Sequence, residues 1–346
     1  MASNHPVKVK SPSATSHQGA NGQSATSVAS LMSNISTSGS DQKRGTNPSG
    51  FSILDRVLDG GFKSRDLVLV GGAPGVGKTV ATLQWARNIA STGRPVVYIS
   101  YEHDERSLFA RLLLMELGDL PDKGRGNGTA ELRPIVQAVA RGEQAMHEGR
   151  ANNVRLEAAW SRVEAYGGKL ALVRGSASTG ANEMTRLIQG ADGKSAVLFV
   201  DYLQKVSTGE ATWDDNVRAS RLGEALKEIA MTSDTTVVAV TAGTRAALTG
   251  KRLRLEHLRG SAGLAYEADV VVMLNEKLLS VSKAHTAFNS LLVEEFRTRV
   301  VFTVEKNRDG PAPVDVEFRK DFGHFRFDPD GSHVAERLID DRMVME

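Results

Sequence analysis

The residues best suited to chemistry form one glycine-rich run of the pattern G-x-x-x-x-G-K-[ST]: Gly72, Ala73, Pro74, Gly75, Val76, Gly77, Lys78 and Thr79. Glycine has no Cβ, so the backbone can curl closely around an anion and point its N–H groups toward it. Lys78 would reach the β- and γ-phosphates of a nucleotide, and the Thr79 hydroxyl would ligate Mg²⁺. The run predicts a binding site for a nucleoside triphosphate, with ATP and Mg²⁺ as the expected cofactors.

The sequence on either side of this run supplies the expected structural context. Residues 67–70 are all apolar, which is typical of a buried strand, and residues 80–90 contain neither proline nor glycine, which favours a helix. A strand, a glycine loop and a helix in this order bring the helix N-terminus to the phosphates. A chance glycine-rich turn would need neither neighbour, so the context favours a functional phosphate-binding loop.

Two acidic residues follow apolar segments that are expected to be strands of the same sheet. Asp201 comes directly after residues 196–200, and we expect it to hold the Mg²⁺ ion. Glu102 follows residues 95–101, and ligands of such sheets bind beyond the carboxyl ends of the strands. Glu102 is therefore predicted to be the base that orients and deprotonates the attacking water. The alternative is that Glu102, or Asp104, caps a helix that begins near residue 105.

The composition excludes several classes of chemistry. The chain has 346 residues and no cysteine, so it has no disulfide, thiolate zinc site or thiol nucleophile. A formal net charge of +2 gives no argument for a polyanionic partner, so nucleic acid would need a local basic patch. No apolar run approaches the roughly 18 residues of a membrane span, and the N-terminal residues lack the apolar core of a secretory signal. We expect a soluble cytoplasmic protein without membrane association.

The chain divides by composition into a tail and a core. Residues 1–45 are dominated by Ser, Ala, Thr, Asn, Gly and Gln. This composition offers too little apolar surface to offset the entropy of ordering, so we expect a disordered tail. Its few basic residues fit either a nucleic-acid arm or, more simply, a solvated segment. One ATPase domain is expected over residues 46–346, with a polar, helix-favouring insertion at about 118–168.

The core alternates strands and helices. Strands are predicted near residues 67–70, 95–101, 170–173, 197–200, 237–241 and 270–274, and helices near 51–58, 80–90, 107–117, 181–188 and 217–231. Residues 300–306 and 314–327 alternate polar and apolar positions, which is typical of antiparallel strands. The predicted fold class is α/β: a mainly parallel sheet flanked by helices, with antiparallel strands at the C-terminal edge.

An ordered series of motifs resembles the motor domain of replicative hexameric DNA helicases of the DnaB type. The matching stretches are residues 49–79, 98–118, 197–206, 257–274 and 305–311. The run Asp201-Tyr-Leu-Gln204 is much more specific than an acid after an apolar strand. The resemblance spans residues 49–327 apart from the insertion, and it implies a RecA-like P-loop ATPase core.

The resemblance also implies residue roles. The glycine-rich loop would hold phosphate and metal, Asp201 would hold the metal through water, and Glu102 would be the base. Lys306 and Arg308 match the pair that reaches the γ-phosphate bound to a neighbouring subunit. Such cations stabilise the charge that spreads over the γ-phosphate oxygens in the transition state. A homo-oligomeric ring, as a hexamer, is then implied; the alternative is a solvated basic strand edge.

The match weakens at residues that couple ATP to DNA in this family. Thr241 fits, but Ala242 stands where the family has a glutamine that senses the γ-phosphate. Alanine cannot hydrogen-bond to phosphate, so coupling would be impaired or rerouted through Thr244 or Arg245.

The DNA-facing loop also departs from the family pattern, because Arg259 is followed by Gly-Ser-Ala. Arg252, Arg254 and Arg259 still form a local basic cluster that could contact the phosphates of single-stranded DNA. A solvated basic loop is an equally good interpretation of the same residues.

Two hypotheses of different class follow. The first is a Mg²⁺-dependent, oligomeric ATPase of the DnaB-like type that binds, unwinds or translocates on DNA. The alternative is a RecA-fold ATPase that regulates or assembles protein partners without moving on DNA. Ala242, the altered loop and the lack of a helical primase-binding domain before residue 46 favour the second hypothesis, or a phage, plasmid or accessory paralogue. The intact loop and carboxylates argue against an inactive nucleotide-binding scaffold.

Overall fold

The computed structural model describes residues 17–18, 24–25, 28, 32, 45–121, 133–134, 136–138, 152–191, 196–207, 215–243, 252–258, 260–282 and 290–339. The chain divides into two compact units, residues 1–45 and 46–346. In the first unit, strand β1 (His17–Gln18) pairs with β2 (Ser24–Ala25) in antiparallel fashion. The predicted disordered tail falls largely on residues outside those described, and residues 122–132, 135 and 139–151 of the predicted insertion at 118–168 also lie outside them.

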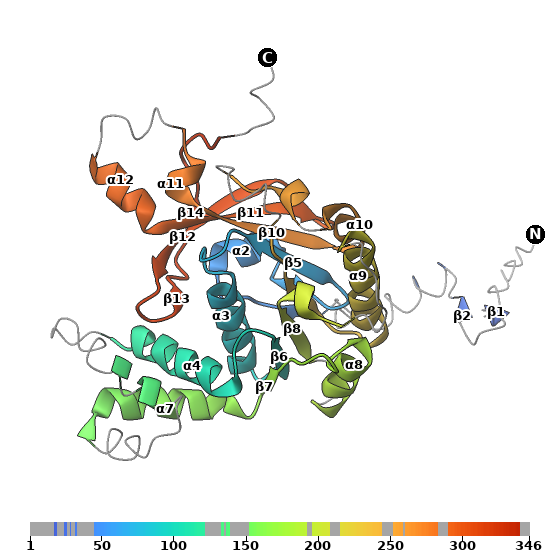
Figure 1. Ribbon diagram of the computed structural model, residues 1–346, viewed down its shortest axis with the longest axis horizontal. Helices are drawn as coiled ribbons and strands as arrows, with labels where there is room; N and C mark the ends of the chain where they lie inside the picture. Colours follow the sequence, from blue (N-terminus) through green and yellow to red (C-terminus); the bar gives the residue numbers. More distant parts are fainter. Residues whose placement is uncertain are drawn as a thin grey trace, which may run out of the picture. The chain divides into compact units, whose positions relative to one another are not determined.

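The second unit is built on one large twisted sheet (Figure 1). Its strand order is β13-β12-β11-β10-β5-β9-β8-β6-β7, with β14 beside β12. The strands are β5 (Leu67–Gly72), β6 (Val96–Ser100), β7 (Leu170–Arg174), β8 (Val197–Asp201), β9 (Val237–Val240), β10 (Val270–Glu276), β11 (Arg299–Asn307), β12 (Val314–Asp321), β13 (Arg326–Phe327) and β14 (Ser332–His333). Strands β10 to β7 in this order are parallel, and β11 to β14 are antiparallel. This arrangement confirms the predicted fold class.

Helices cover both faces of the sheet (Figure 1). One face carries α2 (Ser52–Val57), α3 (Lys78–Ser91), α4 (Glu105–Asp119) and α7 (Val154–Gly167). The other carries α8 (Ala181–Gly190), α9 (Asp215–Thr232) and α10 (Ser261–Glu267). The shorter elements are α11 (Lys277–Ser280), α12 (Ser290–Arg297), the 3₁₀ turns η1 (Leu203–Lys205) and η3 (Leu255–His257), and the pair β3 (Thr46–Asn47) and β4 (Phe62–Lys63). None of the described helices is long and apolar enough to cross a bilayer.

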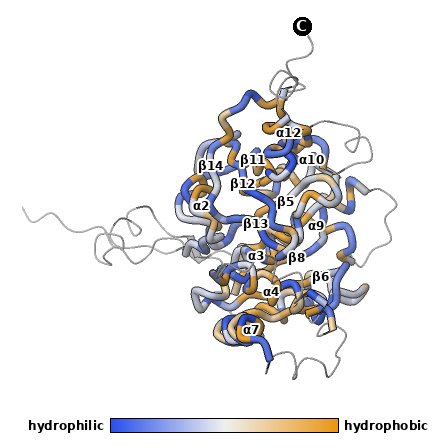
Figure 2. Tube along the Cα trace, turned by 90° about the vertical axis from the view of Figure 1, so that its left-hand side faces the viewer, coloured by the Kyte–Doolittle hydropathy of each residue, from blue (hydrophilic) through white to orange (hydrophobic). Residues whose placement is uncertain are grey.

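The apolar runs of the central strands explain this three-layer arrangement. In β5, Val68 and Val70 pack toward the α3 face, whereas Leu67 and Leu69 pack toward the α9 face. Side chains of a strand alternate between faces, so a strand covered on both sides must be apolar at every position. Hydrophobic residues also run along α4 and α7, which pack against each other beneath the sheet (Figure 2).

The register brings the ends of the parallel strands to a common edge. Ser100 pairs with Asp201 across β6 and β8, and Val70 pairs with Val240 across β5 and β9. The phosphate-binding loop follows β5, and Glu102 follows β6 by two residues. Residues predicted to hold phosphate, metal and water therefore meet at one edge of the sheet, although they are distant in the sequence.

Candidate active site

A cavity of about 600 Å³ opens at the carboxyl edge of the parallel strands. This volume is within the range of small-molecule sites in proteins. Its walls come from the glycine-rich loop, the segment before α4, Arg133, the ends of β8 and β9, and the turn between β12 and β13. The lining residues are Pro74, Gly75, Gly77, Lys78, Thr79, Val80, Glu102, Arg133, Asp201, Tyr202, Val240, Thr241, Ala242, Phe322 and Phe325.

The phosphate-binding loop leads directly into α3. Gly77 is the residue before the helix and has φ of 105°. A Cβ at Gly77 would lie 2.7 Å from the rings of Phe322 and Phe327, so glycine is required by both the backbone and the neighbours. The Lys78 ammonium donates to the carbonyls of Gly72 and Ala73 at 2.9 Å each. These bonds hold the lysine at the mouth of the loop, where a phosphate would replace the carbonyls as its partner.

Asp201 lies at the centre of a hydrogen-bond cluster. The Thr79 hydroxyl donates to Asp201 Oδ2 at 2.7 Å, and the Tyr98 hydroxyl donates to the same oxygen at 3.1 Å. Burial raises the pKa of Asp201, because the charged form loses water while its hydrogen bonds offset only part of the cost. Burial lowers the pKa of Lys78, because its charged form also loses water, and the negative charges of Asp201 and Glu102 raise it by a smaller amount. A ligand of opposite charge beside either group would stabilise its ionised form further.

The donors beside the loop fit a Mg²⁺ ion that arrives with a nucleotide. Mg²⁺ prefers oxygen ligands and is usually held by one or two carboxylates together with substrate phosphates. Thr79 and Asp201 present a hydroxyl and a carboxylate oxygen side by side. Within the described residues, no group of three or more His, Cys, Asp or Glu side chains could hold a metal by itself. The chemistry of the donor set thus suits a metal–nucleotide complex better than a permanently bound metal.

The sequence left open whether Glu102 or Asp104 caps the helix that begins near residue 105, and the structure distinguishes the two. Asp104 is the N-cap of α4 and accepts a hydrogen bond from the Ser107 N–H at 2.7 Å. Glu102 precedes the helix, is exposed, and lines the cavity. Its backbone N–H donates to Ser100 Oγ at 3.3 Å. The cap is therefore Asp104, and Glu102 is left at the cavity with the phosphate-binding loop.

Phe322, Phe325 and Arg111 are among the residues at or beside the cavity that were not predicted from the sequence. Phe322 and Phe325 lie in the turn between β12 and β13, inside a range expected to be continuous strand. Arg111 of α4 has its guanidinium carbon 4.6 Å from the Phe325 ring centre, and its Nη2 lies 3.4 Å from His103 Nδ1. Burial lowers the pKa of Arg111, while the charges of Asp201 and other nearby acids act in the opposite direction. The one available signal was an arginine in the otherwise apolar stretch 108–115.

Gln204 occupies the position next to Ala242. Its amide Nε2 donates to Thr241 Oγ1 at 2.8 Å, and its Oε1 accepts from the Ala242 N–H at 3.2 Å. Thr241 and Ala242 both line the cavity. The Gln204 amide thus links the segments that follow β8 and β9, beside the position where the resemblance led us to expect a glutamine. Thr244 and Arg245, the other candidates for this link, lie outside the described residues.

Lys306 and Arg308 lie toward the opposite end of the sheet. Lys306 of β11 pairs with Val271 of β10, and Val271 pairs with Leu69 of β5. Leu69 is three residues, or roughly 10 Å, before the end of β5 at which the phosphate-binding loop begins. The Lys306 ammonium donates to the Ala265 carbonyl at 2.6 Å, and Arg308 lies 3.2 Å from Asp269 with 54% of its side chain exposed. Neither residue is among those described as lining the cavity of the same subunit.

The structure gives the predicted DNA-binding arginines other partners. Arg252 is 4% exposed, forms an ion pair with Asp315, and donates to Thr303 Oγ1 at 3.0 Å. Arg254 pairs with Glu305 at 2.7 Å. A buried guanidinium with a carboxylate partner is not available to a DNA phosphate in this conformation.

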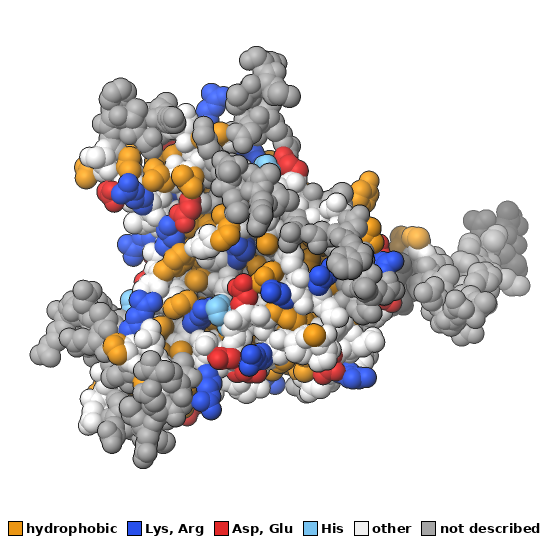
Figure 3. Space-filling model, viewed as in Figure 1, with side chains coloured by type: hydrophobic (Ala, Val, Ile, Leu, Met, Phe, Trp, Pro, Cys, Tyr) orange, Lys and Arg blue, Asp and Glu red, His pale blue; other side chains and the backbone are white. Residues whose placement is uncertain are grey.

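Arg259, the third predicted arginine, lies outside the described residues. On the described part of the face in Figure 3, basic and acidic side chains are interspersed rather than gathered into one basic stripe. The geometry of the described residues therefore gives no DNA track on this face.

Comparisons with known proteins agree with the fold. A family model for the DnaB-like helicase C-terminal domain matches residues 47–327. The chain is 27% identical over 281 residues to the replicative DNA helicase DnaB of Treponema pallidum, covering 80% of this chain and 55% of that protein. It is 24% identical to DnaB of Geobacillus stearothermophilus, with 80% and 56% covered. The chain thus spans about half the length of the curated relatives it matches.

Two solved structures share the fold. One, described as an ATPase domain, superimposes with a TM-score of 0.65 at 22% identity, covering 86% of this chain and 96% of that domain. The other, a DnaB-like replicative helicase studied for its interactions with primase, gives a TM-score of 0.64 at 21% identity, with 87% and 66% covered.

Proposed function

The chain belongs to the DnaB-like helicase C-terminal domain family, and we propose that it is a Mg²⁺-dependent ATPase that works as a ring of identical subunits on single-stranded DNA. The observation that carries the ATPase part of the proposal is the meeting of Lys78, Thr79, Glu102 and Asp201 at one cavity, whereas the ring and the DNA are inferred from the family. These residues come from three different parts of the sheet edge, and each has the chemical character that phosphoryl transfer requires.

ATP binding would begin at the glycine-rich loop. The backbone N–H groups at the start of α3 would donate to the phosphates, and the helix dipole would favour their negative charge. The Lys78 ammonium would exchange the carbonyls of Gly72 and Ala73 for phosphate oxygens. Thr79 and Asp201 would hold Mg²⁺, which neutralises charge on the phosphates when bound.

Hydrolysis would depend on Glu102. Its carboxylate lies at the cavity without a capping role, so it can accept a proton from a water that attacks the γ-phosphate. Arg111 lies close enough for the charges of Asp201 and Glu102 to act on it, so a guanidinium stands near the acids of the site. Glu102 would orient the water and take its proton, and the positive charge of Arg111 would partly offset the negative charge of the two acids.

Completion of the site would require a neighbouring subunit. Lys306 and Arg308 lie toward the end of the sheet opposite the cavity of their own subunit. A ring or filament would bring such a pair to the next subunit's γ-phosphate, where an arginine is worth roughly 10³–10⁵ in rate. Isolated subunits would then turn over ATP slowly.

The engaged arginines and Ala242 favour a second function, that of an ATPase that does not act on DNA. Arg252 and Arg254 are engaged in ion pairs, and Ala242 cannot sense phosphate as a glutamine would. A RecA-fold ATPase that acts on protein partners would need neither a DNA track nor this sensor. DNA-independent turnover would identify this alternative.

The test of the ATPase proposal is Mg²⁺-dependent ATP turnover by the full chain, measured over a range of protein concentrations. We expect turnover that rises more steeply than the concentration and that Lys78→Ala abolishes. A chain that neither binds nor hydrolyses Mg²⁺-ATP would contradict the proposal.

A further inference from the structure

The turn between β12 and β13, residues 321–326, forms one wall of the nucleotide cavity and is called here the aromatic turn. Phe322 and Phe325 line the cavity, and the Phe322 ring approaches Gly77 of the phosphate-binding loop. Phe325 has φ of 54°, a left-handed conformation that is uncommon for a bulky residue. Such a conformation persists only where the surrounding contacts hold it. The turn is therefore held in place by its neighbours.

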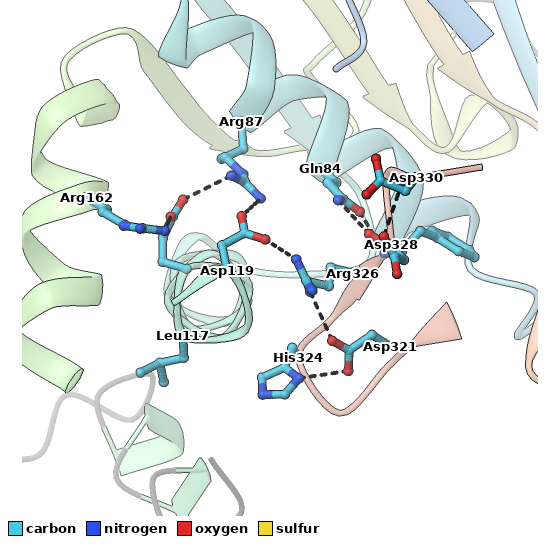
Figure 4. A network of polar contacts seen from close by, with 12 residues as sticks. Gln84, Arg87, Leu117, Asp119, Arg162, Asp321, His324, Arg326, Asp328 and Asp330 are labelled. Atoms are coloured by element: carbon cyan, nitrogen blue, oxygen red, sulfur yellow. Dashed lines mark hydrogen bonds and ion pairs between the residues drawn. The ribbon is translucent and has the colours of Figure 1, made fainter. Parts of the chain in front are cut away.

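Ion pairs fix the aromatic turn to the helix that begins beside Glu102 (Figure 4). Arg326 Nε donates to Asp321 Oδ2 at 3.0 Å, which closes the turn on itself, and the Arg326 guanidinium also pairs with Asp119 at the end of α4. His324 Nδ1 lies 2.8 Å from the other oxygen of Asp321. Asp119 in turn accepts from Arg87 of α3 at 2.7 Å. Arg326 thus links the turn to both helices that flank the cavity.

A second contact anchors the strand that follows the turn. The Gln84 amide of α3 donates to the Phe327 carbonyl at 2.9 Å and accepts from the Phe327 N–H at 2.8 Å. Gln84 is 1% exposed, so these bonds are protected from water. Because Gln84 holds the base of the turn independently, the loss of Arg326 would loosen the tip that carries the two phenylalanines without detaching β13.

We propose that Arg326 is a positioning residue, whose ion pair with Asp119 holds Phe322 and Phe325 as a platform for the base of the nucleotide. The inference rests on the proposed function, because it requires that a nucleotide occupies the cavity. Phenyl rings cannot donate to phosphate oxygens, but they stack on any base. The chemistry of the turn therefore suits the base, whereas the loop with Lys78 suits the phosphates.

The Arg326–Asp119 ion pair and the hydrolytic residue Glu102 lie at opposite ends of α4, so their effects can be measured separately. Asp119 is the last residue of α4, and Glu102 precedes the first residue by three positions. The fifteen residues of this helix span roughly 22 Å, so the ion pair is remote from the hydrolytic end. Loss of Arg326 should weaken ATP binding while the chemical step continues at its former rate once ATP is bound.

The experiment compares ATP with inorganic tripolyphosphate, which has the phosphates but no base. For Arg326→Leu we expect KM and Kd for ATP to rise about tenfold, as part of a base-stacking interaction is lost, with kcat within about twofold. Binding of tripolyphosphate should not change. Arg186→Leu is the matched control, because Arg186 forms an exposed ion pair with Glu183 away from the cavity. The control should bind both ligands as the unmodified chain does.

Two further variants keep the inference open to refutation if Arg326→Leu fails to fold. Phe325→Ala should show the same selective loss of ATP over tripolyphosphate, and Arg326→Lys should restore part of the ATP affinity. Equal loss of both ligands, or unchanged ATP affinity in a variant that melts normally, would overturn the positioning role. If the unmodified chain binds neither ligand, or if Lys78→Ala leaves both bound, then the proposed ATPase function itself has failed.

Discussion

Exchange of Glu102 for glutamine tests the chemistry of the site most cleanly, because this side chain does not cap a helix and is not part of the buried core. Glu102 is exposed at the cavity, and Asp104 rather than Glu102 caps α4. Replacing one carboxylate oxygen by an amide at an exposed position should change the free energy of unfolding by no more than about 0.5 kcal/mol. Loss of a general base typically reduces the rate by about 10²–10⁴, or roughly 3–5 kcal/mol in the barrier.

The assay is single-turnover and steady-state hydrolysis of Mg²⁺-ATP, with ATP affinity and melting temperature measured on the same preparations. Glu102→Gln should keep the affinity within about threefold and lose turnover by the factor above. Asp104→Asn is the control, since asparagine caps a helix as well as aspartate does and the residue lies only two positions away. Turnover of Glu102→Gln within twofold of the unmodified chain would refute its role as base, as would an equal loss in Asp104→Asn.

Three other predictions follow from the contacts of single residues. Arg308→Ala should be nearly inactive alone but rescued in mixed assemblies by subunits that keep the arginine and carry Lys78→Ala; no rescue at any ratio would exclude action on a neighbour. Arg252→Ala should lower the free energy of unfolding by about 1–3 kcal/mol in urea titrations, because it removes the contacts of a buried guanidinium with Asp315 and Thr303; an unchanged stability would argue that it is available for DNA. Burial raises the pKa of Asp321, but hydrogen bonds from His324 and Arg326 outweigh this and lower it to about 2. Its stabilisation is therefore complete above the unfolded value near 3.8 and lost as pH falls toward 2, so Asp321→Asn should cost about 1–2 kcal/mol at pH 6 and less at pH 3; a cost that grows at low pH would contradict this.

Local sequence patterns were sufficient for the elements that carry the phosphate site. The apolar run 67–70 and the helix-favouring run 80–90 correspond to β5 and α3, with ends that differ by two residues at most. Strand β5 is buried on both faces and must therefore be apolar at every position, and α3 begins directly after the glycine of the loop, so the local sequence alone indicates both elements. The predicted fold class is confirmed for the same reason.

Elements whose form depends on distant partners were not predictable in this way. Residues 314–327 alternate like one strand, yet they form β12, the aromatic turn and β13, because Asp119 and Gln84 hold the turn from other helices. The short helices α10, α11 and α12 also escaped prediction. Their sequences are too short to show helical periodicity without the packing that stabilises them.

The basic cluster shows the same limit for function. Three arginines within eight residues suggested a DNA contact, but the partners of Arg252 and Arg254 lie 63 and 51 residues further along the chain. A sequence shows where charges are close in the chain and not which opposite charges the fold brings to them. The Gln204 contact with Thr241 and Ala242 was hidden for the same reason, since it joins the ends of two strands.

The most direct test of the account is steady-state ATP hydrolysis with and without single-stranded DNA, at low salt and over a range of protein concentrations. The account predicts that DNA stimulates turnover several-fold and that activity depends steeply on concentration, as expected for a ring whose sites are completed by neighbouring subunits. Robust turnover that is indifferent to DNA would contradict it and would identify an ATPase that acts on protein partners.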